Sequence, residues 1–121
     1  MVETNSILEK KLKKLAVQLH LEYFGKGPED VWVKIYRNVV SFYCSKTVTP
    51  LEETILKITN GKEEVLRIRE KILEHIKPNL FSEIGKVSNN MVLSFTADLC
   101  IETKALHGSI LFLHELEKDN S

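Results

Sequence analysis

The chain has 121 residues, of which 43% are hydrophobic and 28% charged, so we expect one folded domain over residues 1–121, ordered from about 5 to 116. Its 17 basic and 17 acidic side chains cancel, which argues against a nucleic-acid partner. No apolar run approaches the roughly 20 residues that span a bilayer, and the N-terminus lacks the apolar centre of a signal peptide. We therefore expect a cytoplasmic protein without direct membrane insertion.

The first predicted element is a helix that begins at a capping box of Ser6 and Glu9 and ends at Gly25, a natural left-handed cap. Its core stripe holds apolar residues at helical spacing: Leu8, Leu12, Leu15, Ala16 and Leu19. A second apolar set lies on the opposite side, where a surface helix is normally polar: Val17, Leu21 and Phe24. Either this second face is buried within the monomer, or it contacts a second copy or another partner.

The solvent side of the same helix has a basic cluster of Lys10, Lys11, Lys13 and Lys14. A solvated helix face explains the cluster, and weak attraction to an anionic membrane surface is the alternative. Each exposed lysine contributes at most about 1 kcal/mol near such a surface. Four lysines could therefore hold the protein peripherally at the inner face of the membrane but would not anchor it.

A glycine-rich turn follows the helix and precedes a predicted β-hairpin over residues 30–45. Phosphate-binding loops run in the other direction, from strand into helix, so that backbone N–H groups meet the anion. Gly25 and Gly27 lie in the wrong order for such a loop, and Pro28 has no N–H to donate. We interpret the turn as structural.

The second helix has the clearest start signal in the chain. Thr49 is placed at the N-cap, Pro50 at the first helical position and Glu52 three residues after the cap, which completes a capping box. Residues 60–61, Asn-Gly, are predicted to end this helix. Its inner face is predicted to hold Leu51, Ile55 and Ile58.

A third helix is predicted from about Lys62, with a kink or a break near Lys77 because Pro78 removes a backbone donor. A short helix over residues 80–84 should follow. Two strands are predicted over residues 90–98 and 107–116, and the segment between them is either a long hairpin loop or a continuation of the strands. The order α-β-β-α-α-β-β predicts a two-layer α+β sandwich, with helices on one face of a four-stranded, mainly antiparallel sheet.

No assembled catalytic or metal-binding motif is apparent, and we expect no cofactor. The four histidines are scattered, and no two have the i, i+4 spacing that puts a pair on one metal. Cys44 and Cys100 are expected to be reduced thiols, with a cross-strand disulfide as the alternative. As a nucleophile, Cys44 would need a nearby base, and no local residue supplies one.

Arg69 stands inside the apolar stripe of the third helix. It is either a snorkelling side chain at the sheet edge or an interior charge paired with an acid or a ligand anion. Asp98, at the end of a predicted strand, is the acid that we hypothesise as its partner.

Five segments stand out together: GKGPEDVWV, VVSFYC, TVTPLEETIL, VLRIREKI and SFTADLCIET. They resemble a bacterial family, formerly a domain of unknown function, that is named after MpsC, and the resemblance covers about residues 5–116. The family name refers to a sodium-translocating, membrane-potential-generating system. The resemblance implies a small accessory protein beside integral-membrane partners, and it supplies no reaction and no catalytic residues.

We therefore expect a non-enzymatic cytoplasmic interaction domain, a homodimer, accessory to a membrane ion-transport system. The alternative is a small-molecule- or anion-binding regulatory module, with Arg69 or the 25–28 turn near the site. A small enzyme that uses Cys44 or a histidine is a third hypothesis, which nothing in the sequence supports.

Overall fold

The structure is a computed structural model that describes residues 2–116. These residues form three helices and four strands in the predicted order α-β-β-α-α-β-β. The elements are α1 (Val2–Phe24), β1 (Val31–Tyr36), β2 (Val39–Cys44), α2 (Pro50–Leu56), α3 (Gly61–Ser88), β3 (Val92–Cys100) and β4 (Ala105–Phe112).

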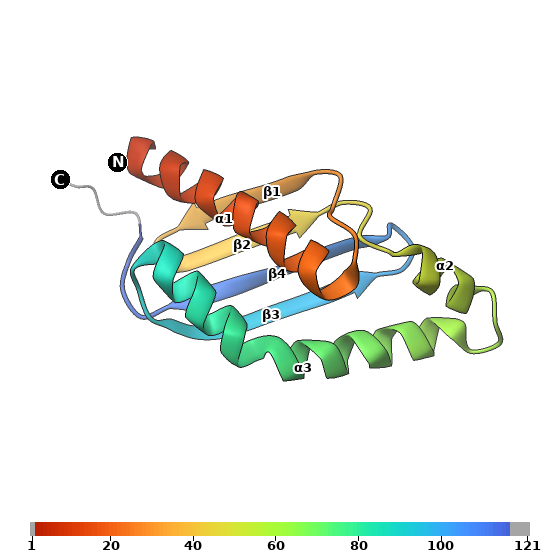
Figure 1. Cartoon of the computed structure of the whole chain (residues 1–121). Helices are drawn as coiled ribbons and strands as arrows, with labels where there is room; N and C mark the ends of the chain where they lie inside the picture. Colours follow the sequence, from red (N-terminus) through yellow and green to blue (C-terminus); the bar gives the residue numbers. More distant parts are fainter. Residues whose placement is uncertain (1, 117–121) are drawn as a thin grey trace.

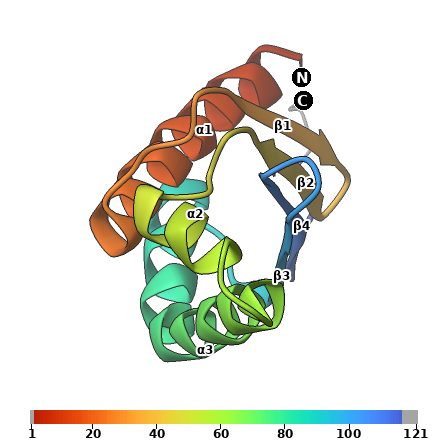
Figure 2. The ribbon, with the colours of Figure 1, turned by 90° about the vertical axis from the view of Figure 1, so that its right-hand side faces the viewer.

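The four strands form one antiparallel sheet in the order β1-β2-β4-β3. Helices α1 and α3 lie across one face of the sheet (Figure 1). Seen from the end, all three helices lie on the same side (Figure 2). The predicted two-layer α+β sandwich is therefore confirmed, and in the part of the chain that the structure describes no helix covers the other face of the sheet.

The core lies between this helical layer and the sheet. Strand residues at a spacing of two, such as Val33 and Ile35, point toward the helices. Residues at helical spacing in α3, such as Ile76 and Leu80, meet them from the helical side. The central strand β4 contributes Phe112, whose side chain is fully buried. The main core members are Leu12, Leu15, Val33, Ile35, Val40, Ile76, Leu80, Ile84, Val92, Ile110 and Phe112.

Helix α1 begins earlier than predicted. Its backbone is helical from Val2, so the capping box at Ser6 does not mark its start. The predicted end is confirmed: Gly25 has φ +75°, and its N–H donates to the carbonyl oxygen of Leu21.

Helix α2 starts as predicted but is short. Thr49 and Glu52 form the complete capping box, with Pro50 in the first turn. The helix ends at Leu56 rather than at residues 60–61, and Leu51 and Ile58 are 70% and 61% exposed, so the predicted inner face is wrong for these two residues. The buried side of α2 is instead the side of Glu52, whose carboxylate binds Arg69 of α3.

Helix α3 continues through Pro78, so of the two predicted alternatives near Lys77 the break is excluded, and the separate short helix is wrong. The missing donor and the ring of Pro78 are typical causes of a bend, and α3 changes direction along its length in Figure 1. Residues on both sides of the proline pack on the sheet, since Ile76, Leu80 and Ile84 are all buried. This packing holds the helix together across the proline.

The last hairpin resolves the alternative left open by the sequence. The strands continue: β3 extends to Cys100, β4 begins at Ala105, and residues 101–104 form the turn. β4 also ends at Phe112, before the predicted residue 116. A Cβ at Gly108 would lie 1.9 Å from the carbonyl oxygen of Thr96, so this close strand contact requires glycine.

Candidate functional site

A buried ion pair joins helices α2 and α3. Arg69 is 7% exposed, and its Nε and Nη2 atoms donate to the two carboxylate oxygens of Glu52 at 2.6 and 2.7 Å. This bidentate geometry is among the strongest that a carboxylate accepts. Arg69 is therefore an interior charge paired with an acid, which is one of the two predicted alternatives.

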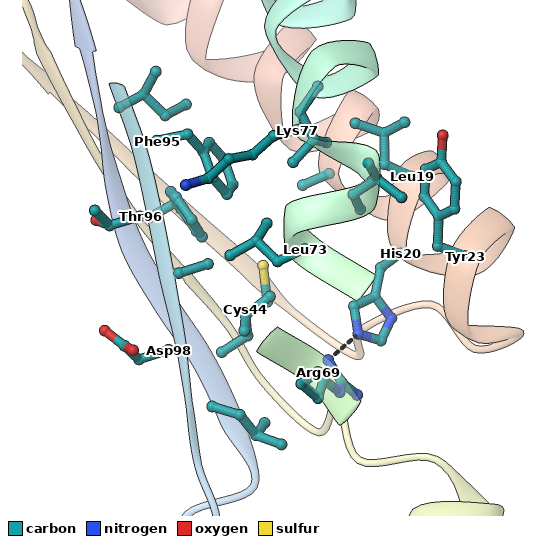
Figure 3. A pocket seen from close by; sticks show the side chains of 18 of the residues that line it. Leu19, His20, Tyr23, Cys44, Arg69, Leu73, Lys77, Phe95, Thr96 and Asp98 are labelled. Carbon is teal, nitrogen blue, oxygen red and sulfur yellow. Dashed lines mark hydrogen bonds between the residues drawn. The ribbon is translucent and has the colours of Figure 1, made fainter. Parts of the chain in front are cut away.

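The predicted partner of Arg69 is wrong. Asp98 is exposed and lies opposite His107 of β4, on the face of the sheet that the helices leave uncovered. Its side chain points away from the helical layer in Figure 3. Because β3 continues beyond Asp98, the alternation of the strand turns this residue outward and its neighbours inward.

Arg69 makes two further hydrogen bonds, one to a backbone carbonyl and one to a ring nitrogen. Nη2 also donates to the carbonyl oxygen of Thr47 at 2.8 Å, and Nη1 lies 3.1 Å from Nε2 of His20. The guanidinium carbon lies 4.0 Å from the ring centre of Phe24, a cation–π contact. Phe24 thus packs inward on Arg69, so burial within the monomer, one of the two predicted alternatives for the second apolar face of α1, holds for Phe24, whereas Val17 and Leu21 are exposed.

His20 is held neutral by this arrangement. Its Nε2 accepts from Arg69, so the proton lies on Nδ1, which donates to the carbonyl oxygen of Lys26. Burial lowers the pKa of His20, and this effect outweighs the opposing hydrogen bond to Lys26. The ammonium of Lys26 in turn donates to the carbonyl oxygen of Val48 at 3.0 Å.

The 25–28 turn is tied to the cluster through Lys26, as a structural turn should be. It connects the end of α1 to the segment before α2. Gly27 packs under α1, where an added Cβ would lie 3.5 Å from the side chain of Val17, and Pro28 is half-buried. The turn therefore positions His20 against Arg69, in agreement with the structural role expected for it.

Glu52 serves two elements at once. Its Oε1 accepts the backbone N–H of Thr49 at 2.9 Å, which caps α2, and the same carboxylate binds Arg69 of α3. Burial alone would raise the pKa of Glu52, but the hydrogen bonds from Arg69 and Thr49 outweigh it and lower the pKa. The charged form is thus the one that the fold selects.

Stability should therefore fall on acidification through His20. The pKa of His20 in the folded chain lies below the ordinary value of 6.5. At a pH between the folded-state pKa and 6.5, the unfolded chain therefore binds more protons than the folded chain. The contribution of neutral His20 is complete above pH 6.5 and declines below it, by at most about 1.4 kcal/mol per pH unit. Urea unfolding on either side of this pH measures the change. His20→Gln should flatten the dependence, whereas the substitution His75→Gln at an exposed site should leave it as steep as in the natural chain.

An apolar cavity of about 590 Å³ extends from this cluster between α1, α3 and the sheet. Leu19, Leu73 and Phe95 are among its walls, and Arg69 and His20 lie at one end (Figure 3). Lys77 lines the cavity as well, where its ammonium pairs with Glu74 at 3.2 Å. The volume falls within the range typical of small-molecule sites.

Cys44 also lines the cavity, as a free and buried thiol. Burial raises its pKa to about 11, so the thiol is protonated at neutral pH and is a weak nucleophile. Cys100 is free as well, so the two cysteines form no disulfide. Among the side chains that the structure describes, no three His, Cys, Asp or Glu residues come close enough to bind a metal ion together.

Sequence reasoning did not connect three members of the cluster. Glu52 was interpreted only as a helix cap, His20 as one of several scattered histidines, and Thr47 contributes a backbone carbonyl that no side-chain pattern reveals. The available signal was the conjunction of an arginine in an apolar stripe with a capping carboxylate 17 residues away.

These features define a small α+β domain whose three helices are joined by one hydrogen-bonded polar cluster beside an apolar cavity. Among the described residues, no helix is both long and apolar enough to cross a membrane. The chain belongs to the MpsC family: the family model described as "Na+-translocating membrane potential-generating system (MpsC)" matches residues 4–114.

A relative of the chain is similar along its whole length. The uncharacterized protein YbcI of Bacillus subtilis (strain 168) is 24% identical over 119 residues, which cover 98% of this chain and 96% of the relative. No solved structure matches the chain significantly.

Proposed function

We propose that the protein is a non-enzymatic accessory component of a Na+-translocating, membrane-potential-generating system, which binds other components at the cytoplasmic side of the membrane. The family match carries this proposal, because it spans residues 4–114 and so includes every helix and strand except the first two residues of α1. The role that the family name describes is therefore proposed for the whole domain rather than for a part of it.

The geometry of the polar cluster supports a role without catalysis. A general base needs a free lone pair within reach of a substrate, whereas both ring nitrogens of His20 and both carboxylate oxygens of Glu52 are already hydrogen-bonded inside the protein. Cys44 is protonated at neutral pH. These groups hold α1, α2 and α3 together, which leaves the surface of the domain for binding partners.

The proposal is tested in membrane vesicles from the organism that encodes the chain. Deleting the gene should lower the Na+-dependent membrane potential, and expressing the full chain should restore it. Expression of a Cys44→Ala variant, with Cys100→Ala as its matched control, should restore it equally well because neither thiol is used. Unchanged potential after deletion would refute the accessory role, and loss of function in Cys44→Ala alone, with its melting temperature unchanged, would refute the absence of catalysis.

A second candidate function is a small-molecule-binding regulatory module, which the 590 Å³ cavity favours. Arg69 does not support an anion site, because Glu52 already neutralises its charge. Thermal-shift measurements against a library of apolar metabolites distinguish the two candidates, since a ligand at a hundred times its dissociation constant stabilises by about 2.7 kcal/mol.

A further inference from the structure

The uncovered face of the sheet, which we call the outer face, has side chains in ordered rows across all four strands. The register places Tyr36, Val39 and Leu111 in one row. The register places Ser94 of β3 opposite Leu111 at the end of this row, and the β-bulge between Val92 and Ser94 leaves Leu93 exposed beside it. We call these four residues, Tyr36, Val39, Leu93 and Leu111, the apolar row. Tyr36 is 67% exposed and Leu93 is 46% exposed, so large apolar groups meet water here.

A second row is polar and contains hydroxyl groups. Lys34 of β1 is followed across the sheet by Ser41, Ser109 and Thr96. A third row contains Trp32, Tyr43, His107 and Asp98 in the same strand order.

The two charges of opposite sign lie at opposite edges of the outer face. Lys34 is on edge strand β1, and Asp98 is on the other edge strand, β3. Both are exposed, and neither forms an ion pair with another of the described residues. When two such surfaces face each other after a rotation of 180° about an axis parallel to the strands, the cationic edge of each copy lies near the anionic edge of the other.

We propose that the outer face binds the outer face of a second copy of this chain, about a twofold axis parallel to the strands. Such a rotation keeps each row at its own height and reverses its order, so β1 of one copy lies over β3 of the other. Apolar row then meets apolar row, with Val39 opposite the partner's Leu111. Lys34 lies over the partner's Thr96, one pleat from the partner's Asp98. The result is an isologous contact between two packed sheets.

This surface replaces the dimer contact predicted from the sequence. Phe24 belongs to the buried cluster, which leaves only Val17 and Leu21 of that predicted contact exposed on α1. The outer face offers more: an apolar row, hydrogen-bonding groups and a pair of complementary charges on one continuous sheet. The inference concerns self-association only and does not depend on the proposed membrane partner.

Sedimentation velocity of the full chain over the micromolar range tests the proposal. The natural chain should form a dimer, and Leu111→Glu should raise the dimer dissociation constant at least about tenfold, because it places a charge in the apolar row. Lys34→Glu and Asp98→Lys should each weaken the dimer, and the double variant should restore it because the charges again match. Leu21→Glu on α1 is the matched control and should leave the dissociation constant unchanged.

Three results would overturn the inference. The first is a natural chain that stays monomeric throughout the micromolar range. The second is dissociation by Leu21→Glu but not by Leu111→Glu, which would place the contact on α1. The third is a double charge variant no better than either single one, which would exclude the proposed axis. Circular dichroism melting of each variant separates loss of the dimer from loss of the fold.

Discussion

Glu52→Ala is expected to lower the free energy of unfolding by about 3–5 kcal/mol, because it leaves the buried guanidinium of Arg69 without its counter-charge. The same change breaks the capping box of α2, because the Glu52 carboxylate accepts the backbone N–H of the N-cap residue Thr49. Arg69 cannot lose its proton to escape the penalty. It can only keep its bonds to Thr47 and His20 or draw water into the core.

Urea unfolding at neutral pH measures this loss. Glu53→Ala is the matched control, because Glu53 is the next residue of the same helix and pairs with Lys104 in a partly exposed ion pair at 2.7 Å. Exposed pairs of this kind contribute about 0–1 kcal/mol. A Glu52→Ala variant no less stable than Glu53→Ala would show that the buried pair has no structural role.

A double-mutant cycle separates the pair from its surroundings. Arg69→Leu alone leaves the buried Glu52 carboxylate without its counter-charge and should also be strongly destabilising. Arg69→Leu combined with Glu52→Leu leaves no unpaired charge. The double variant should therefore be less destabilised than the sum of the two single variants. Additive losses would mean that the two side chains act independently.

The order and type of the elements could be predicted because their signals are local. The alternation of Val31, Val33 and Ile35 and the Thr49 capping box each lie within a few residues of chain, and the structure contains both as predicted. The continuity of α3 could not be predicted in this way. An internal proline disfavours a helix by about 3 kcal/mol, and only the burial of Ile76 and Leu80 against a sheet assembled from distant segments outweighs it.

The candidate site was predictable only in part, for a related reason. An arginine in an apolar stripe left two interpretations open, a snorkelling side chain or a paired interior charge, and the second is correct for Arg69. The identity of its partner depends on how two helices pack, and Glu52 already had a sufficient local role as a cap. The predicted pairing with Asp98 was wrong because β3 continues for two residues beyond it. Asp98 therefore lies inside the strand, where the alternation of side chains turns it away from the helices.

Phe112→Ala is expected to lower the free energy of unfolding by about 3–5 kcal/mol, because it removes a large side chain from a site that cannot readily collapse. Phe112 is fully buried at the end of β4, which is hydrogen-bonded to strands on both sides. Its backbone N–H donates to the carbonyl oxygen of Asn38, whose side chain donates back to the carbonyl oxygen of Phe112. These bonds hold the backbone in place, so the surrounding core should relax little into the space.

The adjacent residue provides the control for this substitution. Leu113 is 49% exposed, and Leu113→Ala should cost less than about 1 kcal/mol because about half of the residue stays in water in the folded chain. Urea unfolding of both variants, with the same denaturant slope, measures the difference. Equal losses would mean that the core does not close over Phe112 as the structure shows. A large difference would show that Phe112, at the end of β4, is a fixed part of the core, whereas the exposed side chain next to it contributes little to the stability of the fold.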